Sequence, residues 1–134
     1  MTTDPSPLAL IESIYAAFGR GDVATILGHT TADAVYDFAG GSPAVPWHGP
    51  WRGHDGVTTF FTRLGETVEF ETFTPLAFAA GGDAVAVRLH LRYRIRATGR
   101  VVDEQQVHWW TLRGGKVAAL RHFEDTAQVI AAAT

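Results

Sequence analysis

The sequence predicts an α+β fold in which helices come first and an antiparallel sheet follows. Up to about Thr67 most apolar residues recur at helical spacing, whereas beyond it they alternate with polar residues as they do in strands. Glycine pairs at residues 81–82 and 114–115 mark turns between such strands. Helices followed by strands, without βαβ alternation, are typical of the α+β class.

Two helices are predicted before the first strand. In residues 6–21 an apolar stripe runs along one side, Ser6 can cap the helix, and Pro7 suits its first turn. Glycines end this stretch, and Asp22 begins a short second helix. Residues 33–39 then have the composition of a short strand.

A long irregular segment follows this first strand. The glycines and prolines of residues 40–53 exclude regular structure there. Asp55 is expected to cap a third helix. This helix should place its large apolar residues on one side: Val57, Phe60, Phe61 and Leu64.

Four strands are predicted after the third helix, at residues 68–73, 84–96, 101–112 and 117–124. In the second of them the odd-numbered residues are apolar, whereas the even-numbered ones from Arg88 onward are arginine or histidine. Because successive side chains of a strand point to opposite faces, the odd-numbered face must be the buried one.

The turn at Thr98-Gly99 decides which face of the next strand is buried. A two-residue turn would pair Leu89 with His108 and Tyr93 with Glu104, and would turn Gln106 inward with them. A three-residue loop would bury Gln105, Val107 and Trp109 instead. The residues of the turn leave both registers open. The last strand offers a similar choice, between an inner row of Ala118, Leu120, His122 and Glu124 and one of Val117, Ala119, Arg121 and Phe123.

Bulk properties limit the classes of function. The chain has 134 residues, of which 46% are hydrophobic and 19% charged, so one globular domain is expected over residues 1–134. The sequence has no cysteine, which excludes a thiolate nucleophile and cysteine-ligated zinc. Its first residues do not resemble a signal peptide, so we expect a cytoplasmic location. The net charge of −3 and the lack of a long apolar run favour neither nucleic acid nor membrane as a partner.

Two segments carry a resemblance to a known family. The stretch "WRGHDGVTTFF" before the third helix and the ending "VHWWTLRGGKVAALRHFEDT" resemble SnoaL-like and ketosteroid-isomerase-related members of the nuclear transport factor two-like superfamily. The resemblance covers nearly the whole chain. It implies a cone, in which a curved mixed or antiparallel sheet wraps the N-terminal helices around an apolar pocket. It also implies a homodimer.

The resemblance also proposes pocket positions. By analogy with limonene epoxide hydrolase they are Leu89, Leu91, Tyr93, Glu104, Gln106, His108, Leu120, His122 and Glu124. The catalytic arginine and aspartates of that hydrolase would fall on Leu89, Leu91 and His122, so its mechanism is not expected. The general base of ketosteroid isomerase would fall on Phe38, and only a one-residue slip would restore Asp37. Its acidic oxyanion partner falls on or next to His108.

Proton transfer is the chemistry that these residue types favour. A carboxylate and an imidazole in one apolar cavity can act as general base and acid, while tyrosine hydroxyls or an amide stabilise a carbonyl or enolate. We therefore predict catalytic roles for His108, Glu104 and His122. The predicted substrate-binding residues are Tyr36, Phe38, Trp47, Trp51, Leu89, Leu91, Tyr93, Gln106, Trp110, Leu120 and Glu124.

The predicted function is binding of a small apolar organic molecule, with cofactor-free proton transfer of the isomerase or polyketide-cyclase type. Two alternatives stay open: a non-catalytic ligand-binding or accessory protein on the same scaffold, and a module that binds proteins through the outer face of the sheet. A structural interpretation of the polar residues also stays open, in which His108 and Gln106 satisfy buried groups of a narrow core while His122 and Glu124 lie at the rim in water.

Two other groups of residues suggest sites that we do not predict. His48 and His54 stand without a His-x-x-x-His or carboxylate partner motif, so no metal site is predicted. The even-numbered arginines Arg88, Arg92, Arg94 and Arg96 can face Glu69, Glu71 and Asp103. A salt-bridged or dimer-forming face is therefore favoured over nucleic-acid binding.

Overall fold

The structure is a computed structural model that describes residues 5–134. Its helices are α1 (Pro7–Gly19), α2 (Val23–Gly28), α3 (Gly53–Thr67) and α4 (Thr126–Ala133). Its strands are β1 (Thr30–Phe38), β2 (Trp51–Arg52), β3 (Val68–Gly81), β4 (Ala84–Ile95), β5 (Val101–Arg113) and β6 (Lys116–Phe123). None of the helices in this part of the chain has the length and apolar character that a bilayer span needs.

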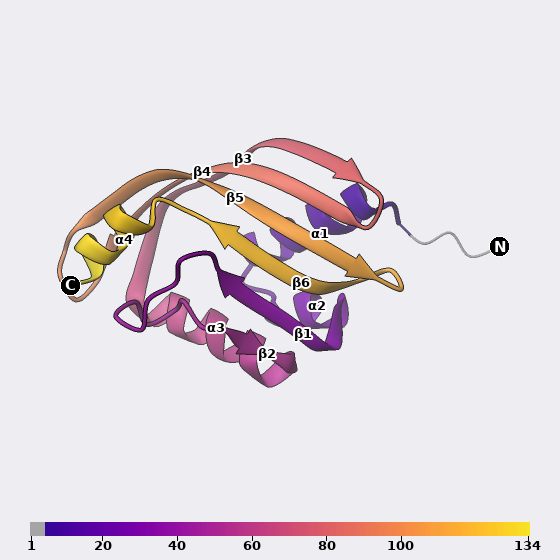
Figure 1. Cartoon of the computed structure of the whole chain (residues 1–134), viewed down its shortest axis with the longest axis horizontal. Helices are drawn as coiled ribbons and strands as arrows, with labels where there is room; N and C mark the ends of the chain where they lie inside the picture. Colours follow the sequence, from indigo (N-terminus) through magenta and orange to yellow (C-terminus); the bar gives the residue numbers. More distant parts are fainter. Residues whose placement is uncertain (1–4) are drawn as a thin grey trace.

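One curved sheet organises the fold. Its strand order is β2-β1-β6-β5-β4-β3, and all pairs are antiparallel except β1 with β6, which is parallel. Figure 1 shows the long strands β3 to β6 curving over α1 and α2, with α3 below β1. The predicted α+β fold with a cone-like curved sheet is confirmed, and the sheet is mixed because its first and last long strands run the same way.

Local signals explain where the helices begin. Ser6 caps α1 by accepting a hydrogen bond from the Ala9 backbone N–H at 3.1 Å. Asp22 caps α2 through the Thr25 N–H in the same way. The expectation that Asp55 caps α3 is wrong, because α3 begins at Gly53 and Asp55 lies in its first turn. A carboxylate in the first turn still stabilises the helix, because it lies near the positive end of the helix dipole.

Several elements differ from the prediction: β1 begins at Thr30, and β2 lies within residues 40–53, where no regular structure was expected. Strand β3 continues to Gly81, well beyond Phe73, with a register irregularity at Pro75. Helix α4 was not predicted. It packs near the β4–β5 connection, where Thr98 Oγ1 donates to the Ala132 carbonyl at 2.9 Å. The register of the β4–β5 hairpin differs as well.

That register is shifted from the two-residue prediction, although the predicted face is kept. Leu89 pairs with Gln106 and Leu91 with Glu104, because residues 96–100 form a longer connection in which Gly99 has a positive φ of 72°. A shift by an even number of residues keeps every side chain on its face. Neither the two-residue turn nor the three-residue loop forms, and Glu104 and Gln106 point inward as in the first alternative.

The last strand combines both of the inner rows that the sequence left open. Leu120 and His122 are buried, as in the first alternative, but so is Val117 from the second. Thr111 of β5 pairs with Ala119 and Leu112 pairs with Val117, so Ala118 of β6 is an extra residue between the two pairs. This bulge reverses the alternation of inward and outward side chains along β6.

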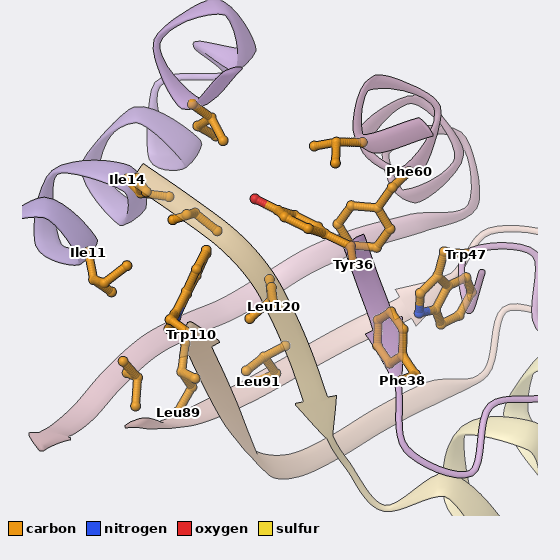
Figure 2. Close-up of a cluster of buried hydrophobic side chains, with 14 of the residues drawn as sticks. Ile11, Ile14, Tyr36, Phe38, Trp47, Phe60, Leu89, Leu91, Trp110 and Leu120 are labelled. Carbon is orange, nitrogen blue, oxygen red and sulfur yellow. The ribbon is translucent and has the colours of Figure 1, made fainter. Parts of the chain in front are cut away.

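The core lies between the concave face of the sheet and helices α1 and α3. Figure 2 shows Ile11 and Ile14 of α1 on the same interior as Trp110 and Leu120 of the sheet. Tyr36 of β1 and Phe60 of α3 meet there with their ring centroids 5.7 Å apart. This apolar interior surrounds the polar side chains described next.

Candidate functional site

A row of buried polar side chains runs along the concave face of β5. Glu104, Gln106 and His108 are 6%, 5% and 4% exposed, while Val107 and Trp109 between and beside them face outward. The alternation follows from the period of a strand. Burying polar groups is costly unless each finds a partner, so the hydrogen bonds of this row decide what it can do.

His108 bonds to two side chains from different elements. Its Nδ1 lies 2.7 Å from the hydroxyl of Tyr15 on α1, and its Nε2 lies 2.9 Å from Oε1 of Gln106. The Tyr15 oxygen also accepts a hydrogen bond from the indole N–H of Trp110 at 3.0 Å. Tyr15, His108 and Trp110 thus form one connected group at the α1 side of the interior.

The amide nitrogen of Gln106 joins this group to two carboxylates. It lies 3.2 Å from Oε2 of Glu104 and 3.4 Å from Oε2 of Glu124. Glu104 accepts two further bonds, from the Tyr93 hydroxyl at 3.1 Å and from the Asp125 backbone N–H at 2.9 Å. Both oxygens of the buried Glu104 therefore have donors, and Glu124 shares the Gln106 amide with it.

The irregular segment after β1 contributes a histidine to the row. Nε2 of His48 lies 2.5 Å from Oε1 of Glu124, and both side chains are almost completely buried. The backbone N–H of Ser42 donates to Nδ1 of His48 at 2.9 Å. The ring of Phe38 stacks on His48 with a centroid distance of 4.7 Å. This segment is thus anchored to the polar row by a side chain.

His122 of β6 lies behind the row. Its Nδ1 donates to the Asp37 carbonyl at 2.9 Å, and its ring lies flat on Phe38 with centroids 3.9 Å apart. The rings of His122 and His108 are 4.7 Å apart and nearly perpendicular. Since a carbonyl oxygen only accepts, Nδ1 of His122 carries the proton and Nε2 is unprotonated in the neutral ring.

Burial shifts the titration of these groups in predictable directions. It lowers the pKa of His122 to about 4 and the pKa of His108 well below its usual value, because each apolar environment disfavours a charged ring. Burial also raises the pKa of Glu104 to about 6, against the opposing effect of its hydrogen bonds from Asp125 and Gln106. The pKa of Tyr15 is raised for the same reason. At neutral pH His108 and His122 are uncharged and Tyr15 is protonated.

Two small cavities lie beside the row, inside the cone. One of about 50 Å³ is lined by Tyr15, Tyr36, Trp110 and Leu120, and one of about 40 Å³ by Phe38, Trp47, Leu91, Tyr93 and Gln106. His108, Phe60, Leu64 and Phe73 line both. An outer groove of about 360 Å³ between α1 and β3 shares Tyr15, Phe18 and Phe73 with the first cavity. A second outer groove, of about 290 Å³, shares Phe18, Ile26, Phe61 and Leu64 with the same cavity.

The predicted site residues fall into three groups. Those that line a cavity are His108, Tyr36, Phe38, Trp47, Leu91, Tyr93, Gln106, Trp110 and Leu120. Glu104, Glu124 and His122 lie behind the cavity walls, where they contact the lining residues. Leu89 is fully buried in the core and Trp51 bonds to the Trp47 carbonyl, and neither is among the residues that line these cavities.

Two residues that bond to this group of polar side chains, Tyr15 and His48, were not predicted as site residues. Tyr15 was assigned to the apolar stripe of the first helix, because its spacing is that of a core residue. His48 was considered only as a metal ligand. Neither position carries a local signal, since both partners are distant in the chain. Within residues 5–134, no three histidine or acidic side chains are placed to hold a metal ion.

Comparisons with known proteins agree on the family. The model for the SnoaL-like domain matches residues 11–120. An uncharacterized protein of Mycobacterium tuberculosis strain H37Rv is 32% identical over 129 residues, which cover 90% of each chain. An NTF2-like protein from Burkholderia xenovorans LB400 has a TM-score of 0.86 and 27% identity, covering 96% of this chain and 95% of that one.

A further solved structure contains an organic molecule. TerC, co-crystallized with polyporic acid, has a TM-score of 0.83 and 25% identity, with 96% of this chain and 98% of that chain covered. The similarity covers nearly the whole chain in each case, in sequence for the mycobacterial protein and in both sequence and shape for the two solved structures. This chain therefore belongs to the family of SnoaL-like domains.

Proposed function

We propose that this protein binds a small, flat, apolar organic molecule inside the cone and moves a proton on it, as an isomerase or a cyclase does. One observation carries the proposal: His108, hydrogen-bonded to Tyr15, faces both cavities, whose remaining walls are mostly aromatic and aliphatic. An apolar pocket with a few convergent polar groups is the usual form of a site for organic molecules.

Two residues at the second cavity, Tyr93 and Glu104, offer a route for the proton that leaves the ligand. Tyr93 lines this cavity and donates its hydroxyl proton toward Glu104, whose pKa is about 6. A proton leaving the ligand would pass to the Tyr93 oxygen while the Tyr93 proton passes to Glu104. A carboxylate with a pKa near neutrality is suited to such exchange, because it is ionised at rest and readily reprotonated.

A ligand would have to widen the cavities in order to bind. Their volumes of about 50 and 40 Å³ are smaller than typical ligand pockets, which begin at roughly 300 Å³. The rings of Phe18, Phe70 and Phe73, which line the outer groove between α1 and β3, are only half-buried and pack edge to face or tilted. They would separate to admit a flat molecule. The crystallization of the related TerC with polyporic acid supports a ligand of this kind.

The proposal is tested by the ligand that the purified protein retains and by its turnover. Retained molecules are extracted and identified by mass spectrometry, and the compound is then returned to the wild type and to Tyr93→Phe. We expect both proteins to bind it, and the variant to lose turnover by at least about 100-fold, the usual contribution of one positioned proton-transfer group. Wild-type turnover that Tyr93→Phe preserves would contradict the proton route.

A non-catalytic binding protein is the second candidate. The observation that favours it is that the polar row satisfies its own hydrogen bonds, from Trp110 through Tyr15, His108 and Gln106 to the two carboxylates. Such a row could serve the structure alone. The same experiment separates the two functions, because a binding protein would retain the compound and return it unchanged.

The outer face of the sheet supports a further proposal, that two copies of the chain pair through it. Val107, Trp109 and Phe123 are 37%, 46% and 43% exposed there, and Val107 lies opposite Phe123 in the β5–β6 pair. Large exposed apolar side chains in one patch are typical of protein interfaces. The neighbouring arginines are paired within the chain, Arg92 with Glu71 at 2.8 Å and with Asp103 at 3.2 Å. An apolar contact is therefore the stronger basis for a dimer.

A further inference from the structure

The second cavity differs from the first in the polarity of its wall. The wall of the first cavity is entirely apolar, whereas polar atoms form part of the wall of the second. The residues with polar side-chain atoms that line the second cavity are Trp47, Tyr93, Gln106 and His108. What these four side chains can offer a ligand depends on which of their donors are already engaged.

Three of the four side chains have no hydrogen left to donate. The Tyr93 hydroxyl donates to Glu104, and both hydrogens of the Gln106 amide nitrogen face carboxylate oxygens. Each ring nitrogen of His108 has a partner of its own. A ligand in this cavity therefore finds no free donor on these three side chains.

The indole N–H of Trp47 is the exception. Within residues 5–134, the N–H groups of Trp51 and Trp110 have acceptors at 2.9 and 3.0 Å, whereas that of Trp47 has none, although this residue is only 2% exposed. Figure 2 shows its nitrogen on the edge of the ring nearest Phe38, and both residues line the second cavity. The cavity is thus the place from which an acceptor can reach this buried donor.

Two contacts hold the segment around Trp47 in position. The next residue, His48, lies 2.5 Å from Glu124 through its Nε2 and accepts the Ser42 N–H at Nδ1. The carbonyl of Trp47 itself accepts the indole N–H of Trp51. A donor that is fixed before the ligand arrives loses little freedom on binding, so its hydrogen bond contributes more to affinity.

The position of the ring relative to Tyr93 defines the site further. The two rings meet edge to face, with centroids 6.2 Å apart and planes at 82°. Trp47 and Tyr93 therefore border the same small space from two elements, the segment after β1 and strand β4. A ligand that reaches Tyr93 also lies beside Trp47.

We propose that Trp47 is a specificity-determining residue, which selects ligands that present an acceptor oxygen, such as a ketone carbonyl, to its indole N–H. The inference rests on the proposed function for the binding of a ligand in the widened cavity, and not for the free N–H of the empty protein. A ligand that is apolar at this edge would leave a buried N–H unpaired and would bind more weakly.

The free N–H is measured without any ligand. Single Trp→Phe variants assign the four indole protons in a ¹H–¹⁵N NMR spectrum, in which a hydrogen-bonded indole proton resonates downfield of a free one. We expect the Trp47 proton to resonate upfield of those of Trp51 and Trp110, which are bonded. A Trp47 proton as far downfield as these two would mean that the donor is already engaged, and would refute the inference.

Two naphthalenes of the same shape measure the selection. We expect 2-acetylnaphthalene to bind the wild type about tenfold more tightly than 2-isopropenylnaphthalene, which has a CH2 group in place of the carbonyl oxygen. The ketone should also move the Trp47 indole proton downfield, and the hydrocarbon should not.

A matched pair of variants assigns this preference to one N–H. Trp47→Phe keeps a flat ring and removes a donor that has no partner in the folded chain, so the fold is retained, and the ratio of affinities should fall to about onefold. Trp109→Phe makes the same change on the outer face of the sheet and should keep the ratio of the wild type.

The results that overturn the inference differ from those that overturn the proposed function. Equal affinity of the wild type for both probes, or a preference that survives in Trp47→Phe, would refute selection by Trp47 and leave the binding of an apolar molecule standing. An unmoved Trp47 proton in the ketone complex would refute it as well. Failure of both probes to bind would contradict the proposed function and the selection together.

Discussion

The neutral, buried His122 should make the stability of this protein depend on pH. Burial lowers the pKa of His122 from 6.5 to about 4 in the folded state, so the folded state binds a proton less readily than the unfolded chain. The stabilisation is therefore fully present above about pH 6.5 and is lost as the pH falls toward 4. A shift of this size corresponds to about 3.4 kcal/mol over the whole window. Between about pH 7.5 and pH 5 the loss is about 2 kcal/mol.

A variant isolates this contribution from all other titrating groups. His122→Phe keeps a flat ring to stack on Phe38, whose centroid lies 3.9 Å away, and removes the titration. The free energy of unfolding of both proteins is measured by urea denaturation across the pH range. We expect the wild type to lose about 2 kcal/mol more than the variant on going to pH 5.

The control distinguishes lost titration from lost packing. Phe61→Leu removes part of a ring that packs on Tyr36 in the same interior and titrates nothing. It should lower stability by the same amount at each pH. If the difference between wild type and His122→Phe stays constant within about 0.5 kcal/mol from pH 7.5 to 5, the argument from burial is wrong.

Three further changes test other parts of the structure. Tyr15→Phe should destabilise the fold by roughly 2–4 kcal/mol in urea denaturation, because it leaves the Trp110 N–H and His108 Nδ1 buried without a partner; a loss below about 0.5 kcal/mol would contradict the hydrogen-bonded group. Leu89→Ala should cost about 2–5 kcal/mol through a cavity, yet leave affinity for the retained compound unchanged, since Leu89 is core and does not line either inner cavity. Trp109→Glu should shift sedimentation from dimer to monomer without lowering the melting temperature, and an unchanged mass would argue against the outer face as the interface.

The sequence was informative where one face of an element is apolar. The alternation in β4 identified its buried face, and the register of β5 could slip by two residues without moving Glu104 or Gln106 to the other side. The length of the β4–β5 connection could not be read from Thr98-Gly99, because several turn types accept that pair. Helix α4 escaped prediction since its short apolar stretch has little periodicity to detect.

The polar row shows the limit of such reasoning more clearly. That carboxylates and histidines share the concave face follows from strand parity, but their pairing does not. His48 reaches Glu124 from 76 residues away, and Tyr15 reaches His108 from 93 residues away. These contacts depend on how α1 and the segment after β1 are packed, which no local pattern encodes.

The parallel pairing of β1 with β6 has a consequence for how the chain folds. The hairpins β3–β4, β4–β5 and β5–β6 join neighbours in sequence and can form early, whereas Asp37 meets His122 only after a loop of 85 residues closes. Until then the aromatic rings of β1 have no sheet to cover them and remain open to water. Docking of β1 is thus the slow step to expect during synthesis, and the incomplete chain, rather than the finished one, is the species most prone to aggregate.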